Sequence, residues 1–352
     1  MPTNTTKNNI ENNIEVNLID APDTLARCLV ADSQVRAVAV NLQTTWIDLL
    51  GQKQLPTAVQ QLLGDLCAVA PLLAATLKLD GALILQIQGD SKSPVRLIVV
   101  EYTANRTLRA AVTLSETVDW ADFTTHCAAD VIGLQQLVNA QGLGRFIVIL
   151  DPTQKLPGQK PYTSLVPIVG DCTAHCIDYY MANSEQLPTK VLLSSNSIAC
   201  AGLFIQRMPS SGGKLATHLQ HITFNDQGHE VLADETHDDT WLRMKYLVNT
   251  LTPTEMLLTN PVTLLRRLFW QENPIAADSQ TIRFFCGCSR QKVQNMLKML
   301  GAEEINSIVA EQGQISVNCD YCSTAYQFDS VDCAAIIASD LSTLTTEINS
   351  VQ

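Results

Sequence analysis

Two short stretches of this 352-residue chain decide how the rest is interpreted: Phe285-Cys286-Gly287-Cys288-Ser289 and, thirty residues further on, Cys319-Asp320-Tyr321-Cys322. Two close cysteine pairs within one small segment indicate a four-thiolate metal site. Zn²⁺ is the expected metal, because tetrahedral sulfur coordination suits it and it needs no redox state of its own. The motifs therefore predict that one Zn²⁺ is bound by Cys286, Cys288, Cys319 and Cys322.

The first cysteine pair leaves the role of the metal open. A zinc ribbon ordinarily uses two CxxC knuckles, whereas the first arm here is CxC. Two cysteines separated by one residue close a small, strained ring when they are oxidised, and such a disulfide is easily reduced again. The spacing is thus compatible with a purely structural zinc, with a redox-responsive zinc, or with an iron–sulfur cluster.

The sequence around the cysteines predicts a small domain over residues 281–335. Ser289 is placed to cap a helix with an apolar i, i+3, i+4, i+7 pattern, and Gly301 ends it. A second short helix follows, and Gly313 then turns the chain into a hairpin that holds the second cysteine pair. Fewer than sixty residues bury little core, so a metal is physically expected to stabilise this domain.

Composition bounds the function. The net charge is −12 and the pI about 4.9, which argues against a nucleic-acid partner, whose phosphates require Lys and Arg. Only 16% of residues are charged, so the chain is not an intrinsically disordered protein. Its length allows two domains.

The chain is expected to be cytoplasmic and without a membrane segment. Residues 1–15 are polar and lack the apolar stretch that an export signal requires, so they are expected to form a disordered tail. The longest uncharged apolar run near the middle, residues 66–77, is too short to span a bilayer. Eleven cysteines in such a compartment are expected as reduced thiols or metal ligands.

Residues 16–232 predict an α+β core. Alternating strands are expected at 82–88, 95–101 and 145–150, and helices at 58–79, with a kink at Pro71, and from about 171 to 180. No glycine-rich phosphate-binding motif, nucleophile elbow, HExxH or paired catalytic carboxylate is present, so no catalytic residue is predicted. Ser184-Glu185 is interpreted as a turn at a helix end before Pro188.

Residues 233–280 predict a helical linker. Three short helices follow a polar, acidic start, and the second opens with the capping-box sequence Thr252-Pro253-Thr254-Glu255. The third opens with Asn260-Pro261. Helices this short need a surface to lie against, so we expect the linker to be docked on another part of the chain. Residues 336–352 are expected to be a tail.

The remaining cysteines and histidines suggest no second site. Cys172 and Cys176 flank His175 at helical spacing, but further ligands are lacking nearby. Small buried thiols are the preferred interpretation of the core cysteines, and Cys333 is a candidate accessory thiol beside the metal site. His218 and His221 are interpreted as surface residues. The other core cysteines are Cys28, Cys67, Cys127 and Cys200.

The chain resembles the heat-shock protein 33 family of redox-regulated chaperones over about residues 20–335. In the C-terminal part the resemblance lies in Phe285–Arg290, Ile308–Ile315, Cys319–Cys322 and Tyr326–Phe328. In the core it lies in Thr76–Gly81, Gln86–Asp90, Leu108–Ala110, and Ser184–Thr189 after Tyr179-Tyr180. The thiols at Cys333 and in the core depart from the family pattern.

The resemblance implies a function. Such proteins bind zinc through these four cysteines when reduced and are then inactive. Oxidation under unfolding stress forms two disulfides, here Cys286–Cys288 and Cys319–Cys322, and releases the metal. The zinc domain and linker then lose order, and the protein holds unfolding client proteins without ATP and tends to form a homodimer.

The expected fold class is therefore α+β, with an N-terminal mixed α/β core domain, a helical linker and a small C-terminal zinc-binding domain. Three functions remain open at this point. The first is a redox-gated, ATP-independent holdase. The others are a constitutive zinc-ribbon interaction module and a thiol–disulfide oxidoreductase that uses the CxC pair.

Overall fold

The computed structural model describes most of the chain. The expected N-terminal tail, nearly all of the tail at 336–352, Cys127 and five of the six histidines lie outside the described residues. Those outside are 1–22, 31–33, 52, 78, 121–122, 124–131, 156–157, 159, 209–221, 225–229, 233–238 and 339–352, and of 222–224, 230–232 and 276–277 only the backbone is described.

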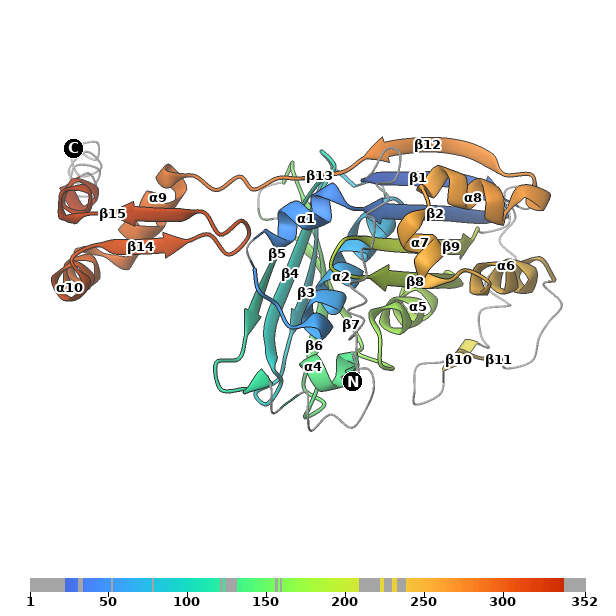
Figure 1. Ribbon diagram of the computed structural model, residues 1–352, viewed down its shortest axis with the longest axis horizontal. Coiled ribbons are helices and arrows are strands. Elements are labelled where there is room, and N and C mark those ends of the chain that lie inside the picture. Colours follow the sequence, from blue (N-terminus) through green and yellow to red (C-terminus); the bar gives the residue numbers. More distant parts are fainter. Residues whose placement is uncertain are drawn as a thin grey trace, which may run out of the picture.

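A long apolar helix, α2 (Thr57–Ala74), lies between two β-sheets at the centre of the core (Figure 1). Its side chains, such as Leu63 and Leu66, are fully buried between both sheets. The predicted helix is confirmed but ends earlier than expected, at Ala74, where the Thr76 N–H turns back to Leu73 O in a tighter turn. By length and composition α2 is apolar enough to cross a membrane, but 72% of it is buried inside the protein, as befits a core helix.

Sheet B, the six-stranded sheet, contains all three predicted strands. These are β3 (Gly81–Gln88), β4 (Val95–Thr103) and β6 (Arg145–Pro152), which lie side by side and antiparallel. The sheet order is β13-β5-β4-β3-β6-β7. The other strands are β5 (Thr107–Leu114), β7 (Tyr162–Val166) and β13 (Arg283–Phe284).

Sheet A, the five-stranded sheet, has the order β12-β1-β2-β9-β8 and is covered on both faces. Alternate residues of one strand point to opposite faces: Val38 and Val40 pack with α2, whereas Ala37 and Ala39 pack against the linker helices. Its strands are β1 (Thr24–Val30), β2 (Val35–Leu42), β8 (Thr189–Ser195), β9 (Cys200–Arg207) and β12 (Ile275–Thr281).

The smaller elements complete the core. The helix predicted after residue 171 is confirmed as α5 (Thr173–Asn183). The others are α1 (Thr44–Leu50), α4 (Leu134–Val138), β10 (Ile222–Phe224) and β11 (Glu230–Leu232).

The three predicted linker helices are present and lie on the outer face of sheet A (Figure 1). The capping box at Thr252 and Glu255 is formed, and the Asn260 side chain accepts from Val262 N. A buried side chain of the sheet holds this layer, because Asn41 Nδ2 donates to Met256 O at 3.0 Å and Leu257 O at 2.9 Å. The helices are α6 (Asp239–Asn249), α7 (Pro253–Leu258) and α8 (Pro261–Leu268), followed by the 3-10 turn η3 (Trp270–Glu272).

A helical linker was expected up to residue 280, but residues 275–281 form the edge strand β12. It pairs antiparallel with β1, from Leu29↔Ile275 to Thr24↔Thr281. The sequence of β12 does not alternate between apolar and polar residues. This is tolerated because an edge strand has one side exposed to solvent. The chain then crosses to sheet B, where β13 pairs parallel with β5.

The C-terminal module (residues 286–338) has the predicted helix–helix–hairpin order. Ser289 caps α9 (Arg290–Leu300), Gly301 has φ 89°, and α10 (Ala302–Gln312) ends at Gly313 with φ 76°. The hairpin is β14 (Ile315–Asn318) and β15 (Ala325–Phe328). A helix over 330–338 was not predicted and adds Cys333 and Ile336 to the module's core.

We expect Asn41→Leu to loosen the linker layer without unfolding the sheets. The substitution leaves two carbonyls at the end of α7 without their donor, at a cost of about 1–3 kcal/mol. Hydrogen exchange measured by mass spectrometry should then become faster in α6–α8, while exchange in α9 and α10 stays as in the unmodified protein. Unchanged protection of α7 would contradict this role for Asn41.

Candidate metal centre

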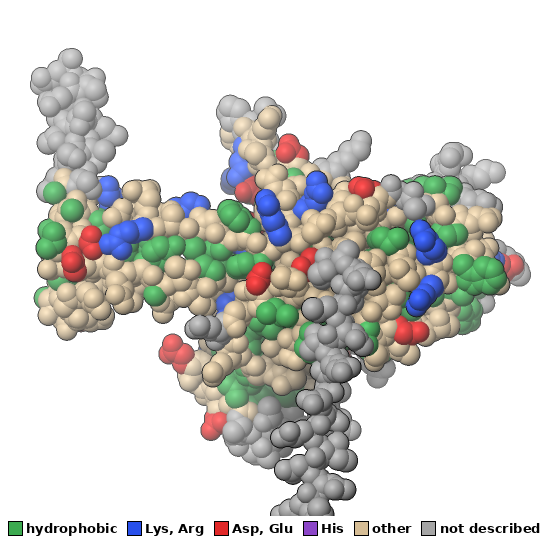
Figure 2. All heavy atoms as spheres, turned by 45° about the horizontal axis from the view of Figure 1, so that its top comes forward, with side chains coloured by type: hydrophobic (Ala, Val, Ile, Leu, Met, Phe, Trp, Pro, Cys, Tyr) green, Lys and Arg blue, Asp and Glu red, His purple; other side chains and the backbone are tan. Residues whose placement is uncertain are grey.

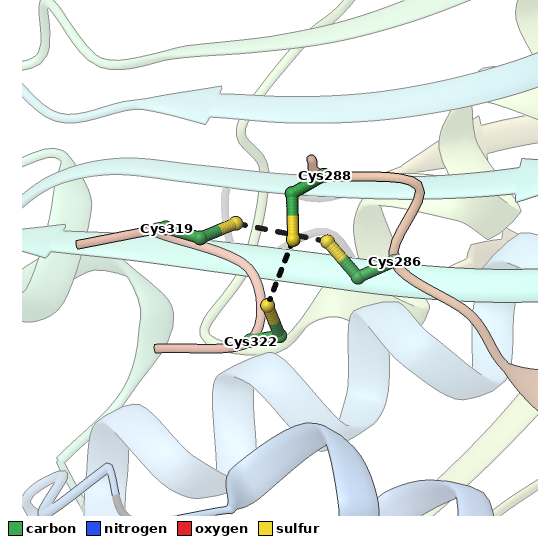
Figure 3. Close-up of side chains that lie close together, drawn as sticks. All are labelled: Cys286, Cys288, Cys319 and Cys322. Carbon is green, nitrogen blue, oxygen red and sulfur yellow. Dashed lines mark hydrogen bonds between the residues drawn. The ribbon is translucent and has the colours of Figure 1, made fainter. Parts of the chain in front are cut away.

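The four predicted cysteines meet at one point, with their sulfur atoms turned toward one another (Figure 3). All four Sγ atoms lie within 4.8 Å of one another. Two contacts join the arms, at 3.6 Å between Cys286 Sγ and Cys319 Sγ and 3.3 Å between Cys288 Sγ and Cys322 Sγ. In the described part of the chain, this is the only group of three or more Cys, His, Asp or Glu with its ligand atoms so close.

These distances fit a metal site and not a pair of disulfides. A tetrahedral Zn²⁺ with Zn–S bonds of about 2.3 Å separates its sulfurs by about 3.8 Å. A disulfide requires about 2.0 Å. The sulfur spacing therefore matches four thiolates around one ion, and the donor set of four soft sulfurs is one that Zn²⁺ accepts.

Local backbone geometry brings the two arms together. The CxC arm begins directly after β13, so sheet B fixes its entry. The second arm is the turn of the β14–β15 hairpin, where Cys319 N donates to Thr324 O at 3.0 Å and Ser323 N donates to Cys319 O at 2.7 Å. Ser323 has φ 60°, a left-handed conformation that closes this tight turn.

Neighbouring side chains contact the sulfurs or the backbone between them. Tyr326 OH donates to Cys288 Sγ at 3.1 Å, and the Thr324 hydroxyl lies 3.1 Å from Cys322 Sγ. Lys292 Nζ donates to Gly287 O at 2.6 Å and so fixes the CxC backbone from the first turn of α9. Such outer contacts orient metal ligands.

The thiols differ in how readily they ionise. Burial raises the pKa of Cys286 to about 12. The Tyr326 hydroxyl acts to lower the pKa of Cys288, but burial and the adjacent Cys322 thiol leave it raised. Burial acts to raise the pKa of Cys322 as well, yet the hydrogen bonds from Thr324 outweigh it and bring the pKa down to about 6. Cys322 therefore ionises more readily than Cys286 or Cys288.

The second cysteine arm is docked on the core. The Arg109 Cζ atom lies 4.4 Å from the centre of the Tyr321 ring, and Arg109 Nη2 forms an ion pair with Glu101 Oε2 at 2.7 Å. Lys53 Nζ donates to Tyr321 O at 2.9 Å and to Ala110 O at 3.0 Å. We call this set of Lys53, Arg109 and Tyr321 the knuckle contact.

Figure 1 shows why the knuckle contact matters for the module. The hairpin turn points toward the core, whereas α9 and α10 lie further out. The module therefore touches the core through the parts that hold the sulfurs, and its attachment depends on their geometry.

The other described cysteines lie apart from this site. Cys28, Cys67, Cys176 and Cys200 are buried, and Cys172 is half-buried at the start of α5. Burial raises the pKa of each of them, to about 11 for Cys28 and about 12 for Cys176. The interpretation of these residues as buried thiols fits the structure, and Cys172, His175 and Cys176 do not form a metal group in the described chain.

Cys333 is near the site in sequence but not in its geometry. Its side chain is 2% exposed and packs in the module's apolar core, with Sγ 3.8 Å from Phe328 O.

Ser184-Glu185 is a helix end as predicted, because Ser184 N bonds to Tyr180 O after α5. The sequence analysis did not identify Lys53, Arg109 and Thr324 as partners of the metal site. The only signal was the aromatic residue inside Cys319–Cys322, which indicates that this turn packs against another surface.

Comparison with known proteins agrees with the geometry. A family model described as "Hsp33 protein" matches residues 23–329. The 33 kDa chaperonin of Methylobacillus flagellatus is 36% identical over 320 residues, which cover 91% of this chain and 96% of that protein. The 33 kDa chaperonin of Neisseria meningitidis is 34% identical over 323 residues, covering 92% and 94% of the two chains.

A solved structure supports the fold. The crystal structure of the 33 kDa chaperonin of Thermotoga maritima, a heat shock protein 33 homolog, superimposes with a TM-score of 0.66 over 91% of this chain and 99% of that one, at 20% identity. With the family model spanning most of the sequence and relatives above 30% identity over nine tenths of it, the chain belongs to the Hsp33 family.

Proposed function

We propose that this protein is a redox-regulated, ATP-independent holdase that binds unfolding proteins under oxidative stress, and that it is not an enzyme. The observation that carries the proposal is the convergence of four sulfurs from two arms in a module that is docked on the core through the same arms. In this proposal residues 16–232 form the core, 233–280 the linker and 281–335 the switch domain.

In the reduced state, Cys286, Cys288, Cys319 and Cys322 hold one Zn²⁺. The metal supplies most of the module's folding free energy, on the order of 10 kcal/mol, because the module has few buried side chains of its own. These are Leu297, Ile305, Ile315, Phe328, Cys333 and Ile336.

Oxidation removes the ligands. Each disulfide forms when two thiolates give two electrons to the oxidant; one molecule of hydrogen peroxide takes up these electrons and two protons and becomes two molecules of water. The pairs we propose are Cys286–Cys288 and Cys319–Cys322. This pairing joins cysteines of the same arm and so breaks the sulfur contacts that join the two arms.

Loss of the metal is transmitted to the linker. Along the chain, α8 is followed by η3, β12, β13 and then the CxC arm, with no further helix or strand between them. When the module melts, β13 and β12 lose their anchor, and the short helices α6–α8 are marginal without a stable neighbour. Their buried residues and the outer face of sheet A, including Leu203 and Ile205, then become available to clients.

Large apolar side chains are already exposed on the module and linker in this state (Figure 2). Met299 is 86% exposed and Trp270 is 69% exposed. Melting would extend these apolar surfaces, while the acidic net charge keeps complexes soluble. We propose a cytoplasmic location, unfolded or partly unfolded clients, no nucleic-acid partner and a homodimer as the oxidised form.

The first test measures zinc content and holdase activity on the same samples. Reduced protein should contain one zinc per chain and suppress little aggregation of a thermally unfolding client. After peroxide treatment at elevated temperature, it should have lost zinc, gained two disulfides and suppressed aggregation without ATP. Peptide mapping should place the disulfides at Cys286–Cys288 and Cys319–Cys322.

Two outcomes would reject this proposal. Zinc that remains bound after oxidation, or equal suppression in both states, would make the metal structural. Cys333→Ala is the matched control, because it removes a thiol of the module that lies outside the sulfur cluster. Its zinc stoichiometry and its two disulfides should match those of the unmodified protein.

A second prediction concerns the knuckle contact. Lys53→Met keeps the aliphatic stem but removes the donor to Tyr321 O and Ala110 O. Losing this bridge should weaken docking by about 1 kcal/mol and accelerate zinc release under peroxide roughly fivefold, with unchanged zinc in the reduced protein. Lys298→Met makes the same charge change in the module away from the core and should release zinc at the original rate; equal rates in both variants would refute the contact's role.

A third prediction is that zinc affinity rises with pH. The raised pKa of Cys286 and of Cys288 means that both thiols must lose protons to bind metal at neutral pH, whereas the lowered pKa of Cys322 makes that thiol easier to ionise. Chelator competition should therefore show tighter binding at about pH 8 than at about pH 6.5. Thr324→Val removes the hydroxyl that lowers the pKa of Cys322 and should make the affinity fall more steeply on acidification; a flat profile would contradict this account.

A further inference from the structure

A second site of a different kind lies in the core. A cavity of about 330 Å³ opens between the two sheets, at the end of α2 and beside α5. None of the residues that line it belongs to the linker or to the module. Its size lies at the lower end of the range of small-molecule sites.

The cavity has an apolar floor and an open rim. Leu83 on β3 is fully buried, and Val148 on β6 is 4% exposed. At the rim, Leu77 is 40% exposed and Tyr162 is 56% exposed. A ligand that enters here therefore meets mostly hydrocarbon.

One cation, Arg36, lies in this apolar wall. Arg36 Nη2 donates to Gln206 Oε1 at 2.5 Å, and Nη1 reaches only Thr76 O at 3.5 Å. In the part of the chain that the structure describes, no carboxylate lies within ion-pair distance of Arg36. Burial, with Arg27 as a further positive neighbour, lowers the pKa of Arg36.

Two donors of this pair are also unused. Arg36 Nε and Gln206 Nε2 are buried and have no hydrogen-bond partner among the described residues, and Gln206 as a whole is 0% exposed. Buried donors and an unpaired charge are costly unless something satisfies them. Arg36 and Gln206 both line the cavity, and the fully buried Gln206 side chain holds the Arg36 guanidinium there.

The one carboxylate among the lining residues is bonded to another lining residue. Glu185 is exposed and accepts from Tyr180 OH at 2.7 Å, and both residues line the cavity. Glu185 therefore places a negative charge on the exposed side of the cavity, in addition to the positive charge of Arg36. This arrangement favours a ligand with one anionic group and disfavours a second anionic group at the opening.

We infer that this cavity binds an amphipathic monocarboxylate, a small molecule with one carboxylate and an aliphatic body. The carboxylate accepts hydrogen bonds from Arg36, for which planar, charge-assisted contacts are favourable. The aliphatic body lies along Leu83 and Val148. Because the site is built from the two sheets, it is present in the reduced protein and is independent of the metal centre.

Decanoate is a suitable probe, with decanol and decanedioate as comparators that lack the charge or carry a second one. Isothermal titration of the reduced, zinc-loaded full chain should show one saturable site for decanoate and weaker binding of both comparators. Methyl NMR of the methionines should localise it, because Met181 lines the cavity and its signal, assigned with Met181→Leu, should shift on titration.

Two variants test the two halves of the site. Arg36→Gln removes the charge and should weaken decanoate binding roughly tenfold or more. Leu150→Trp fills the cavity from β6 and should abolish binding, whereas Leu165→Trp, on the exposed side of β7, should not change it. Circular dichroism and the thermal midpoint establish that each variant is folded.

The inference is overturned if decanol binds as tightly as decanoate, if folded Arg36→Gln binds as the unmodified protein does, or if the Met181 signal does not move. Binding of several decanoate molecules per chain without saturation would also overturn it, since that is adsorption to exposed apolar surface. None of these outcomes bears on the zinc switch, which is measured separately.

Discussion

The convergence of four sulfur atoms is what the C-terminal module depends on. Six apolar side chains are buried in the module's core, too few to offset the conformational entropy of ordering some fifty residues. The two arms that hold the sulfurs are also the two places where the module meets the rest of the protein, through β13 and the knuckle contact. Folding of the module, its docking and the state of its thiols are therefore a single equilibrium.

The path from the metal centre to the linker is short and continuous. Ile282 is 1% exposed, its N–H bonds to Asp23 O, and it separates β12 of sheet A from β13 of sheet B. One extended segment therefore pairs with a strand of each sheet before the chain reaches Cys286. The elements next to the sulfurs along the chain are the two-residue strand β13 and the edge strand β12, and no long helix lies between them and the CxC arm. Loss of the sulfur geometry therefore affects these two short strands first.

Local sequence signals predicted local structure well. The capping residues Ser289 and Thr252, the glycines at 301 and 313, and the alternation in β3, β4 and β6 each depend on neighbouring residues alone, and the structure has them where they were expected. The sulfur cluster was also predictable, because cysteine spacing is a strong signal for a shared metal. What could not be predicted joins residues far apart in sequence: the pairing of β12 with β1, the bond from Lys53 to Tyr321 O, and the bond from Arg36 to Gln206 beside an apolar cavity.

The many cysteines of this chain raise the question of why oxidation should select four of them. A thiol must be accessible to react with peroxide, and Cys67, Cys176 and Cys200 are 0% exposed, whereas the four cysteines of the cluster are only half-buried. The protection of Cys67, Cys176 and Cys200 comes from the two-sheet core, in which they are packed with other buried apolar side chains. Cys333 differs, because the fold that buries it is the module itself. In the proposed switch, the protection of Cys333 ends when the module melts, so the order of events matters: the proposed pairing of the four sulfurs has to precede the exposure of Cys333.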